Sequence, residues 1–377
     1  MKLTKHYLVF LSLCISLLNC AIKAECESPT TLKDALKGKF LIGTAISVGQ
    51  IAGKDPRTVD LALKQFDAIV PENCMKSMYL QPKQGHFFFD DADRFVAFGE
   101  QNHLWMTGHC LVWHSQTPAW FFTDKDGKEV SRDTLIARMK SHITTVVSRY
   151  KGRIKGWDVV NEAFNDDGTY RNSKFYQIIG EDFIPLAFKF AHEADPDAEL
   201  YYNDYNEWRP EKRDAIVKLV KQLKDAGLRI DAVGMQGHIG MDYPGLDEYK
   251  AAIDAYAAAG VKVMVTEFDM SALPSPRQNV GANVSDVEAY RKEMNPYTTG
   301  LPDSVSVAWT NRMAAFFQLF IDNKDKVERV TLWGVTDDHS WKNDFPMRGR
   351  TDYPLLFDRN YQPKAIVSTI IQEAEKQ

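Results

Sequence analysis

The sequence lacks the features of several common classes of protein. It has no excess of basic residues, because its formal net charge is −5 at pH 7 over 377 residues, and it presents no basic face suited to nucleic acid. The apolar run at residues 7–18 is too short to cross a bilayer as a helix, which needs about 20 residues. The expected partner is therefore neutral or weakly charged, and no obligate protein partner is implied.

Cysteine is also scarce, with five residues in the chain. Cys14 and Cys20 fall in the amino-terminal leader described below, which leaves Cys26, Cys74 and Cys110. Three cysteines form no disulfide framework, although they allow one bridge. Their spacing contains no Cys-x-x-Cys pair, so the sequence predicts no structural zinc site.

Two further motifs are missing. His109, His114 and His238 form no helical His-x-x-x-His pair and have no third metal ligand at close spacing. No glycine-rich phosphate turn follows the first predicted strand, which disfavours an open, doubly wound sheet. We therefore expect neither a metal nor another cofactor.

The amino terminus has the build of a secretory signal. Lys2 and Lys5 precede the short apolar run, and Ala24 supplies a small residue after which cleavage can be expected. A competing interpretation is a lipoprotein signal with Cys20 lipidated, which ranks second because Asn19 is larger than the residue usually found before such a cysteine. We expect a signal peptide at residues 1–24, a single domain at 25–377, and a secreted or periplasmic protein, anchored to the membrane only if Cys20 is lipidated.

The rest of the chain is 44% hydrophobic and 26% charged, an ordinary globular composition that suits one large core or two smaller domains. From residue 40, short apolar segments alternate with amphipathic helical stretches without a linker, which predicts a parallel sheet. The predicted strands are residues 40–47, 68–73, 105–113, 154–161, 200–205, 232–238, 261–269 and 330–337, and helices are predicted at 133–150, 211–226, 246–259 and 309–323. Eight strands predict an α/β protein with a single (β/α)8 barrel.

Polar and aromatic side chains follow almost every predicted strand, at the rim where barrel enzymes carry their active sites. Two of these strands end in glutamate: residues 154–161 lead to Glu162, and Glu267 closes the β-branched run that starts at Val261. Either glutamate alone could be a buried ion-pair partner. Two carboxylates at strand ends are what cleavage of a glycosidic bond requires, one as acid and one as nucleophile or base.

One predicted loop is unusually long. Residues 271–306 lie between the seventh strand and its helix, with a short helical stretch predicted near 286–293. A loop of this length in a compact domain is usually functional or disordered. Because it leaves the catalytic rim, we expect it to form a wall of the cleft on the leaving-group side.

The motifs at the strand ends, taken together, resemble glycoside hydrolase family 10, the endo-β-1,4-xylanases, from about Leu32 to the carboxyl terminus. They are Glu-Asn-Cys-Met-Lys at 72–76, Gly-His-Cys-Leu-Val-Trp-His-Ser-Gln at 108–116, Trp-Asp-Val-Val-Asn-Glu-Ala at 157–163, Gln-Gly-His at 236–238, Thr-Glu-Phe-Asp at 266–269 and Trp-Gly-Val-Thr-Asp at 333–337. Each alone is weak, and their combination in order is specific.

The resemblance implies a retaining mechanism in which Glu162 is the acid/base and Glu267 the nucleophile. Asn161 would donate to the sugar 2-hydroxyl. The resemblance also implies that His238 bonds the nucleophile and is held by Asp269, and donors aimed at Glu267 would keep it ionised.

The remaining site residues are implied in the same way. Residues matching those that bind the sugars on the glycone side are Glu72, Asn73, Lys76, His109, Trp113 and Gln116, and Gln236 is counted with the substrate-binding set. Trp333 and Trp341 match aromatic residues of the cleavage subsite, and Tyr205 matches a platform on the leaving-group side. Core packing is the interpretation for His114, Trp157, Phe316 and Phe317.

The sequence therefore predicts a retaining endo-β-1,4-xylanase acting on xylan and xylo-oligosaccharides. A β-glucanase is the alternative within the fold, since xylose differs from glucose by the absence of the C5 hydroxymethyl group. Glu72, Lys76 and Trp341 crowd that space in relatives, which favours xylose. A silent sugar-binding protein is disfavoured because both glutamates are present.

Overall fold

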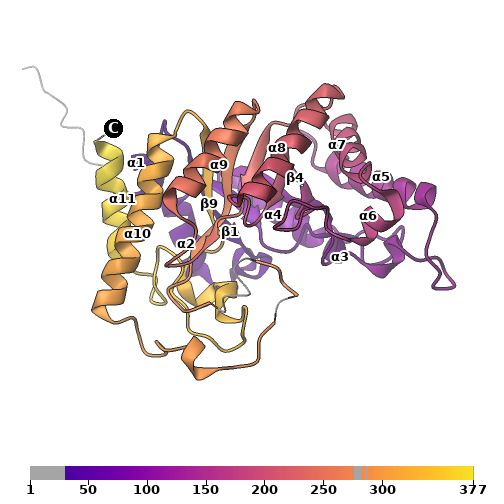
Figure 1. The fold of residues 1–377 in the computed structure, drawn as a ribbon. Coiled ribbons are helices and arrows are strands. Elements are labelled where there is room, and N and C mark those ends of the chain that lie inside the picture. Colours follow the sequence, from indigo (N-terminus) through magenta and orange to yellow (C-terminus); the bar gives the residue numbers. More distant parts are fainter. Residues whose placement is uncertain (1–29, 276–281, 286, 377) are drawn as a thin grey trace, which may run out of the picture.

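The computed structural model describes residues 30–275, 282–285 and 287–376. The predicted signal peptide at residues 1–24 and Cys26 lie outside the described residues, as does part of the predicted long loop. The described chain forms a barrel of parallel strands surrounded by helices (Figure 1). This confirms the predicted α/β barrel.

The barrel closes because each strand pairs in parallel with two neighbours. The order runs from β6 through β5, β4, β3, β2, β1 and β9 to β8, and β8 pairs back with β6. The strands are β1 Leu41–Ile46, β2 Ala68–Pro71, β3 Trp105–Trp113, β4 Gly156–Asn161, β5 Glu199–Asp204, β6 Ala232–Met235, β8 Lys262–Met270 and β9 Val327–Leu332, with a two-residue strand, β7 His238–Ile239, added against β8. All carboxyl ends thus meet at one rim.

Helices cover the outside of the barrel, and α8, α9, α10 and α11 follow one another around it (Figure 1). The α-helices are α1 Leu32–Ala35, α2 Pro56–Gln65, α3 Ser77–Leu80, α4 Asp90–Gln101, α5 Arg132–Arg149, α6 Lys174–Ile179, α7 Phe183–Ala194, α8 Pro210–Asp225, α9 Leu246–Ala258, α10 Asp303–Asp322 and α11 Ala365–Glu375. Shorter helical turns are η1 Gln50–Lys54, η2 Ala119–Phe121, η3 Lys292–Met294, η4 Asp337–His339 and η5 Trp341–Asn343. None of the described helices combines the length and apolar character needed to span a membrane.

The core lies mostly between the strands and the helices. Trp157 on β4 and Phe316 and Phe317 on α10 are at most 1% exposed, which confirms that they pack in the core. A smaller cluster, in which Tyr201 packs with Met264, lies inside the barrel itself. Burial on both faces explains why the strands read as continuous apolar runs.

Two predicted strands were wrong in their extent, and a glycine accounts for where each of them ends. The predicted strand at 232–238 is broken after Met235, and Gly237 in the gap has a φ of +77°. The predicted strand at 330–337 begins earlier, at Val327, and ends at Leu332, just before Gly334 with a φ of +131°. Such backbone angles favour glycine and interrupt a pleated strand.

Two helical predictions also need correction. The predicted helix at 309–323 begins earlier, at Asp303 directly after Pro302, a residue that readily precedes a helix. Near 286–293, the described residues 287–291 are not helical and only the turn η3 follows.

Cys74 and Cys110 are buried and free, so they do not form the bridge that the sequence allowed.

The close packing of β3 against β4 can be tested by substitution at Gly108. A Cβ added at Gly108 would lie 2.1 Å from the ring of buried Trp157. We expect Gly108→Ala to lower the free energy of unfolding by about 1 to 3 kcal/mol, measured by urea denaturation. In the control Gly49→Ala, the new Cβ would meet Lys54 at 3.5 Å, an ordinary contact. Equal stability of the two variants would contradict this account of the packing.

Candidate active site

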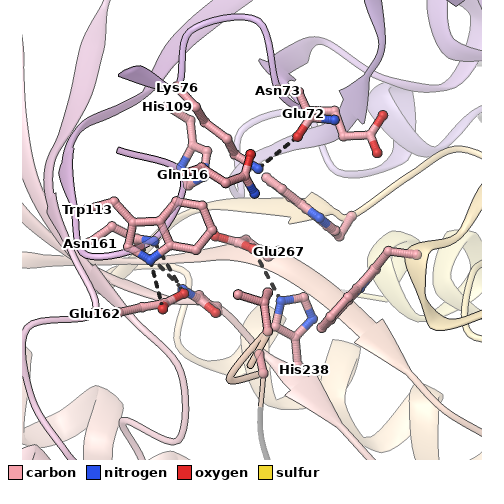
Figure 2. Close-up of a pocket in the computed structure, with 15 residues that line it drawn as sticks. Glu72, Asn73, Lys76, His109, Trp113, Gln116, Asn161, Glu162, His238 and Glu267 are labelled. Carbon is pink, nitrogen blue, oxygen red and sulfur yellow. Dashed lines mark hydrogen bonds and ion pairs between the residues drawn. The ribbon is translucent and has the colours of Figure 1, made fainter. Parts of the chain in front are cut away.

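Two buried glutamates occupy the rim of the barrel and point into one pocket (Figure 2). Glu162 directly follows β4 and has a φ of +58°, which turns its side chain out of the strand direction. Glu267 lies within β8 where the register with β9 shifts between Val265 and Phe268. A bulge of this kind re-aims a side chain. The backbone of each strand is therefore irregular where its carboxylate is presented.

Glu162 receives hydrogen bonds from neutral donors. The indole Nε1 of Trp113 donates to its Oε2 at 2.8 Å, and Gln236 Nε2 donates to its Oε1 at 3.0 Å. Asn161 Nδ2 donates to the same Oε1 at 3.3 Å. Trp113 and Gln236, both predicted as substrate-binding residues, thus also hold this carboxylate in place.

His114 is a residue that the sequence interpretation placed wrongly. Instead of packing as a satisfied core histidine, it is partly exposed, with Nδ1 3.7 Å from Glu162 Oε2 and no hydrogen bond to this nitrogen among the described residues. Burial and the nearby Arg171 lower the pKa of His114 to about 3. His114 is therefore a neutral neighbour of Glu162 at any ordinary pH.

Glu267 has a different set of partners. Asn203 Nδ2 donates to its Oε1 at 2.9 Å, and His238 Nε2 lies 3.2 Å from its Oε2. The other ring nitrogen of His238 forms an ion pair with Asp269 at 3.0 Å. Trp341 Nε1 also donates to Asp269, at 2.7 Å. This arrangement matches the predicted contacts of His238 and Asp269.

The charges around Glu267 favour its ionised form. Burial lowers the pKa of His238, but Asp269 and Glu267 raise it more, to about 9, so the ring carries two protons at neutral pH. Burial raises the pKa of Glu267, but the hydrogen bond from His238 and the nearby His109 and Lys76 bring it below its usual value. A charged donor facing a carboxylate has this effect.

Asn203 is a functional residue that the sequence analysis did not assign. At the carboxyl end of β5, its Nδ2 donates both to Glu267 Oε1 and to Asn161 Oδ1, each at 2.9 Å. Its Oδ1 accepts from Thr266 at 2.6 Å. Its place at a strand end was visible in the sequence, but its position between two carboxylates depends on how β4, β5 and β8 are brought together.

The pocket unites nearly all the predicted site residues. Lys76 Nζ donates to Asn73 at 3.0 Å and lies 5.1 Å from the centre of the Trp113 ring. Burial raises the pKa of Glu72, while the positive charge of Lys76 opposes this shift. The predicted residues that line the pocket are Glu72, Asn73, Lys76, His109, Trp113, Gln116, Asn161, Glu162, Gln236, His238, Glu267, Trp333 and Trp341.

Two predicted residues stand outside this lining. Asp269 lies behind His238 and is fully buried, which suits a supporting position. Tyr205 is 7% exposed, its hydroxyl accepts from Arg171 at 2.7 Å, and Lys212 Nζ lies 4.0 Å from the centre of its ring. Arg171 in turn donates to the carbonyl of Glu162 at 3.0 Å. Tyr205 is thus adjacent to the site, and its role as a sugar platform stays a prediction.

The long loop after β8 reaches the cleft. Ala282 and Val284 line the same pocket as Glu72 and Lys76, which confirms the expected wall. Farther along, the Glu288 amide donates to the carbonyl of Pro346 at 2.7 Å. Whether the loop serves the leaving-group side stays a prediction. In the described part of the chain, no three histidine, cysteine or acidic side chains come together as a metal site.

A parallel barrel that presents two buried carboxylates in one rim pocket is the architecture of a glycoside hydrolase. Comparison with known proteins narrows this class. The profile of glycosyl hydrolase family 10 matches residues 31–373, and the chain belongs to that family.

Two relatives and one solved structure match this chain along almost their whole length. The chain is 52% identical over 359 residues to the endo-1,4-beta-xylanase A of Xylanibacter ruminicola, covering 95% of this chain and 97% of that one. It is 42% identical to an endo-1,4-beta-xylanase of Geobacillus stearothermophilus, over 90% of this chain and 97% of that one. The solved structure of a GH10 endoxylanase from a sugarcane soil metagenome has a TM-score of 0.87 and 44% identity, over 92% of this chain and all of that one.

The raised pKa of His238 makes stability depend on pH. Protonation of His238 contributes stability fully below its ordinary pKa of 6.5, and this contribution is lost as the pH rises through about 9. We expect His238→Gln to be destabilised relative to the parent by an amount that shrinks by about 1 to 3 kcal/mol between pH 6 and pH 10, measured by urea denaturation. His192→Gln, at an exposed position on α7, is the control. A difference that stays constant with pH would argue against a protonated His238.

Proposed function

We propose that this chain is an endo-β-1,4-xylanase that hydrolyses the xylan backbone with retention of configuration. The observation that carries the proposal is the unequal surroundings of two carboxylates in one pocket. Glu267 faces a protonated histidine, whereas Glu162 is bonded by the neutral side chains of Trp113, Gln236 and Asn161. Family 10 is a retaining family, and the relatives named above are endo-1,4-beta-xylanases.

In the first step, the ionised Glu267 attacks the anomeric carbon as Glu162 gives its proton to the glycosidic oxygen. The bond to the leaving sugar breaks with its electron pair, and a glycosyl ester forms on Glu267. The hydrogen bonds from Asn203 and His238 orient Glu267 for this attack. Pre-positioned partners reduce the entropy lost on reaching the transition state.

In the second step, water attacks the anomeric carbon from the side that the first sugar left. Glu162, now ionised, takes the proton from this water, and Glu267 departs as a carboxylate. Two inversions give overall retention. Asn161 stands beside both carboxylates, through its bond to Glu162 and through Asn203, a position from which it can donate to the 2-hydroxyl of the sugar.

Specificity for xylose is proposed to rest on the crowded end of the pocket. Trp341 stacks on Phe345 with ring centres 4.6 Å apart, and its indole nitrogen donates a hydrogen bond to Asp269. A ring held on two sides has little freedom to make room for the C5 hydroxymethyl group of glucose. This rigidity favours a xylanase over a β-glucanase.

The cellular location is a separate proposal that rests on the leader alone. Residues 1–24 have the charge and apolar pattern of an export signal. We infer a secreted or periplasmic enzyme, with a lipid anchor on Cys20 as the alternative. Mass spectrometry of the amino terminus after expression in a secreting bacterium would separate the two.

The roles of the two glutamates predict different responses to the leaving group. In Glu162→Ala, a dinitrophenyl xylobioside needs no acid for the first step, so the covalent intermediate on Glu267 should accumulate, and azide should restore turnover as the β-glycosyl azide. On xylan the loss should be about 100-fold to 10,000-fold. Glu267→Ala should show neither accumulation nor rescue, because it lacks the nucleophile.

The measurements are the hydrolysis rates on both substrates, the mass of the trapped enzyme and the anomeric form of the azide product. Thermal unfolding checks that both variants fold. Equal losses in both variants on both substrates would overturn the assignment. Formation of the α-azide from Glu162→Ala would do the same.

Trp341 should govern the choice between xylose and glucose. Trp341→Ala should raise the ratio of cellobioside to xylobioside hydrolysis, since removed apolar contact is worth about 1 to 3 kcal/mol in discrimination. Trp341→Phe is the matched control, because it keeps an aromatic ring while losing the hydrogen bond to Asp269 and part of the indole's area, and it should change the ratio less. Aryl glycosides of both sugars give the ratio directly. An unchanged ratio in Trp341→Ala would show that this ring does not sense the C5 position.

A further inference from the structure

A group of three exposed apolar side chains lies on the short segment that follows Lys76, a residue of the pocket. It consists of Met78, Tyr79 and Phe88, which are 45%, 48% and 60% exposed. Large apolar residues this exposed are rare in the described part of the chain, where the others are Val287, Tyr290 and Val307. Half of the set is therefore gathered within one short segment.

The backbone of this segment is joined to residues that line the pocket. Lys76 lines the pocket and directly precedes α3, which carries Met78 and Tyr79. The amide of Met78 donates to the carbonyl of Gln116 at 3.0 Å, and the side chain of Gln116 faces the pocket beside Lys76 (Figure 2). The amide of Phe88 donates to the carbonyl of Leu80 at 2.8 Å, at the end of the same helix.

The backbone that carries Met78, Tyr79 and Phe88 is held in place by buried neighbours. Leu80 is fully buried, and Ser77 Oγ lies 3.4 Å from Nε2 of buried His142. On either side of Phe88, the rings of Phe87 and Phe89 turn inward and stack with centres 5.3 Å apart. An exposed aromatic ring on a fixed backbone loses little entropy when it binds a ligand.

We propose that Met78, Tyr79 and Phe88, called the distal strip, bind the xylan chain beyond the sugars that fill the pocket. The inference rests on the proposed function and extends it to longer substrates. Sugar rings have apolar faces that suit aromatic and thioether side chains, and the strip itself bears no charge that a neutral chain would have to desolvate. A protein partner would need an interface of about 1,000 Å², far more than three side chains supply.

The test compares long and short substrates. In Tyr79→Ala, kcat/KM on xylohexaose should fall about 2- to 10-fold relative to kcat/KM on an aryl xylobioside, the range expected for the loss of one aromatic contact. The loss should appear in KM. Tyr79→Phe keeps the ring and should retain the parental ratio. Val307→Ala removes an equally exposed apolar side chain from α10 and should also leave the ratio unchanged.

Binding measured by calorimetry makes the test independent of turnover. The affinity for xylohexaose should fall in Tyr79→Ala by a similar factor, and Phe88→Ala should weaken binding in the same direction. An unchanged ratio and affinity in Tyr79→Ala, or equal losses on long and short substrates, would overturn the proposal. Self-association that Tyr79→Ala abolishes would overturn it in favour of a protein interface. A parent that binds xylohexaose through the strip but hydrolyses no xylan would contradict the proposed function and leave the strip supported.

Discussion

The active site depends on a chain of amide hydrogen bonds between its two carboxylates. Gln236 donates to Glu162 and to Asn161 Oδ1, and Asn203 donates to Asn161 and to Glu267. These residues come from consecutive places around the barrel, at β4, β5, β8 and the turn after β6. Backbone hydrogen bonds between neighbouring strands fix the positions of these amides, which therefore have few alternative partners. The distance between the two carboxylates is thus set by the sheet.

The two carboxylates at the ends of this row of hydrogen bonds have neighbours of different charge. The positive charge of His238, itself fixed by Asp269, lies on the side of Glu267. The uncharged His114 and Trp113 lie on the side of Glu162. In a buried site such differences act with little screening. Two identical side chains therefore have unlike surroundings within one pocket, which the rings of Trp333 and Trp341 also line.

Prediction from sequence succeeded best where one periodic pattern dominated. The strand at residues 105–113 was predicted with both ends correct, and helix α5 was placed within one residue at each end. It failed where a glycine at positive φ interrupted an apolar run, as after Met235 and Leu332. Most of the candidate site residues gather in one pocket, whereas Asp269 and Tyr205 lie outside its lining, His114 was assigned to the core and Asn203 received no role.

Some properties of this protein follow from the sequence by itself. The alternation of strands and helices determines the barrel, and the position of Glu162 and Glu267 near the carboxyl ends of their strands determines which rim carries them, because parallel strands all point the same way. Only the tertiary structure decides which polar groups meet across the barrel. The double contact of Asn203, the approach of His114 to Glu162 and the hydrogen bond from Met78 to Gln116 each join residues that lie far apart in the sequence. Such contacts depend on strand stagger and bulges, which short-range patterns do not encode.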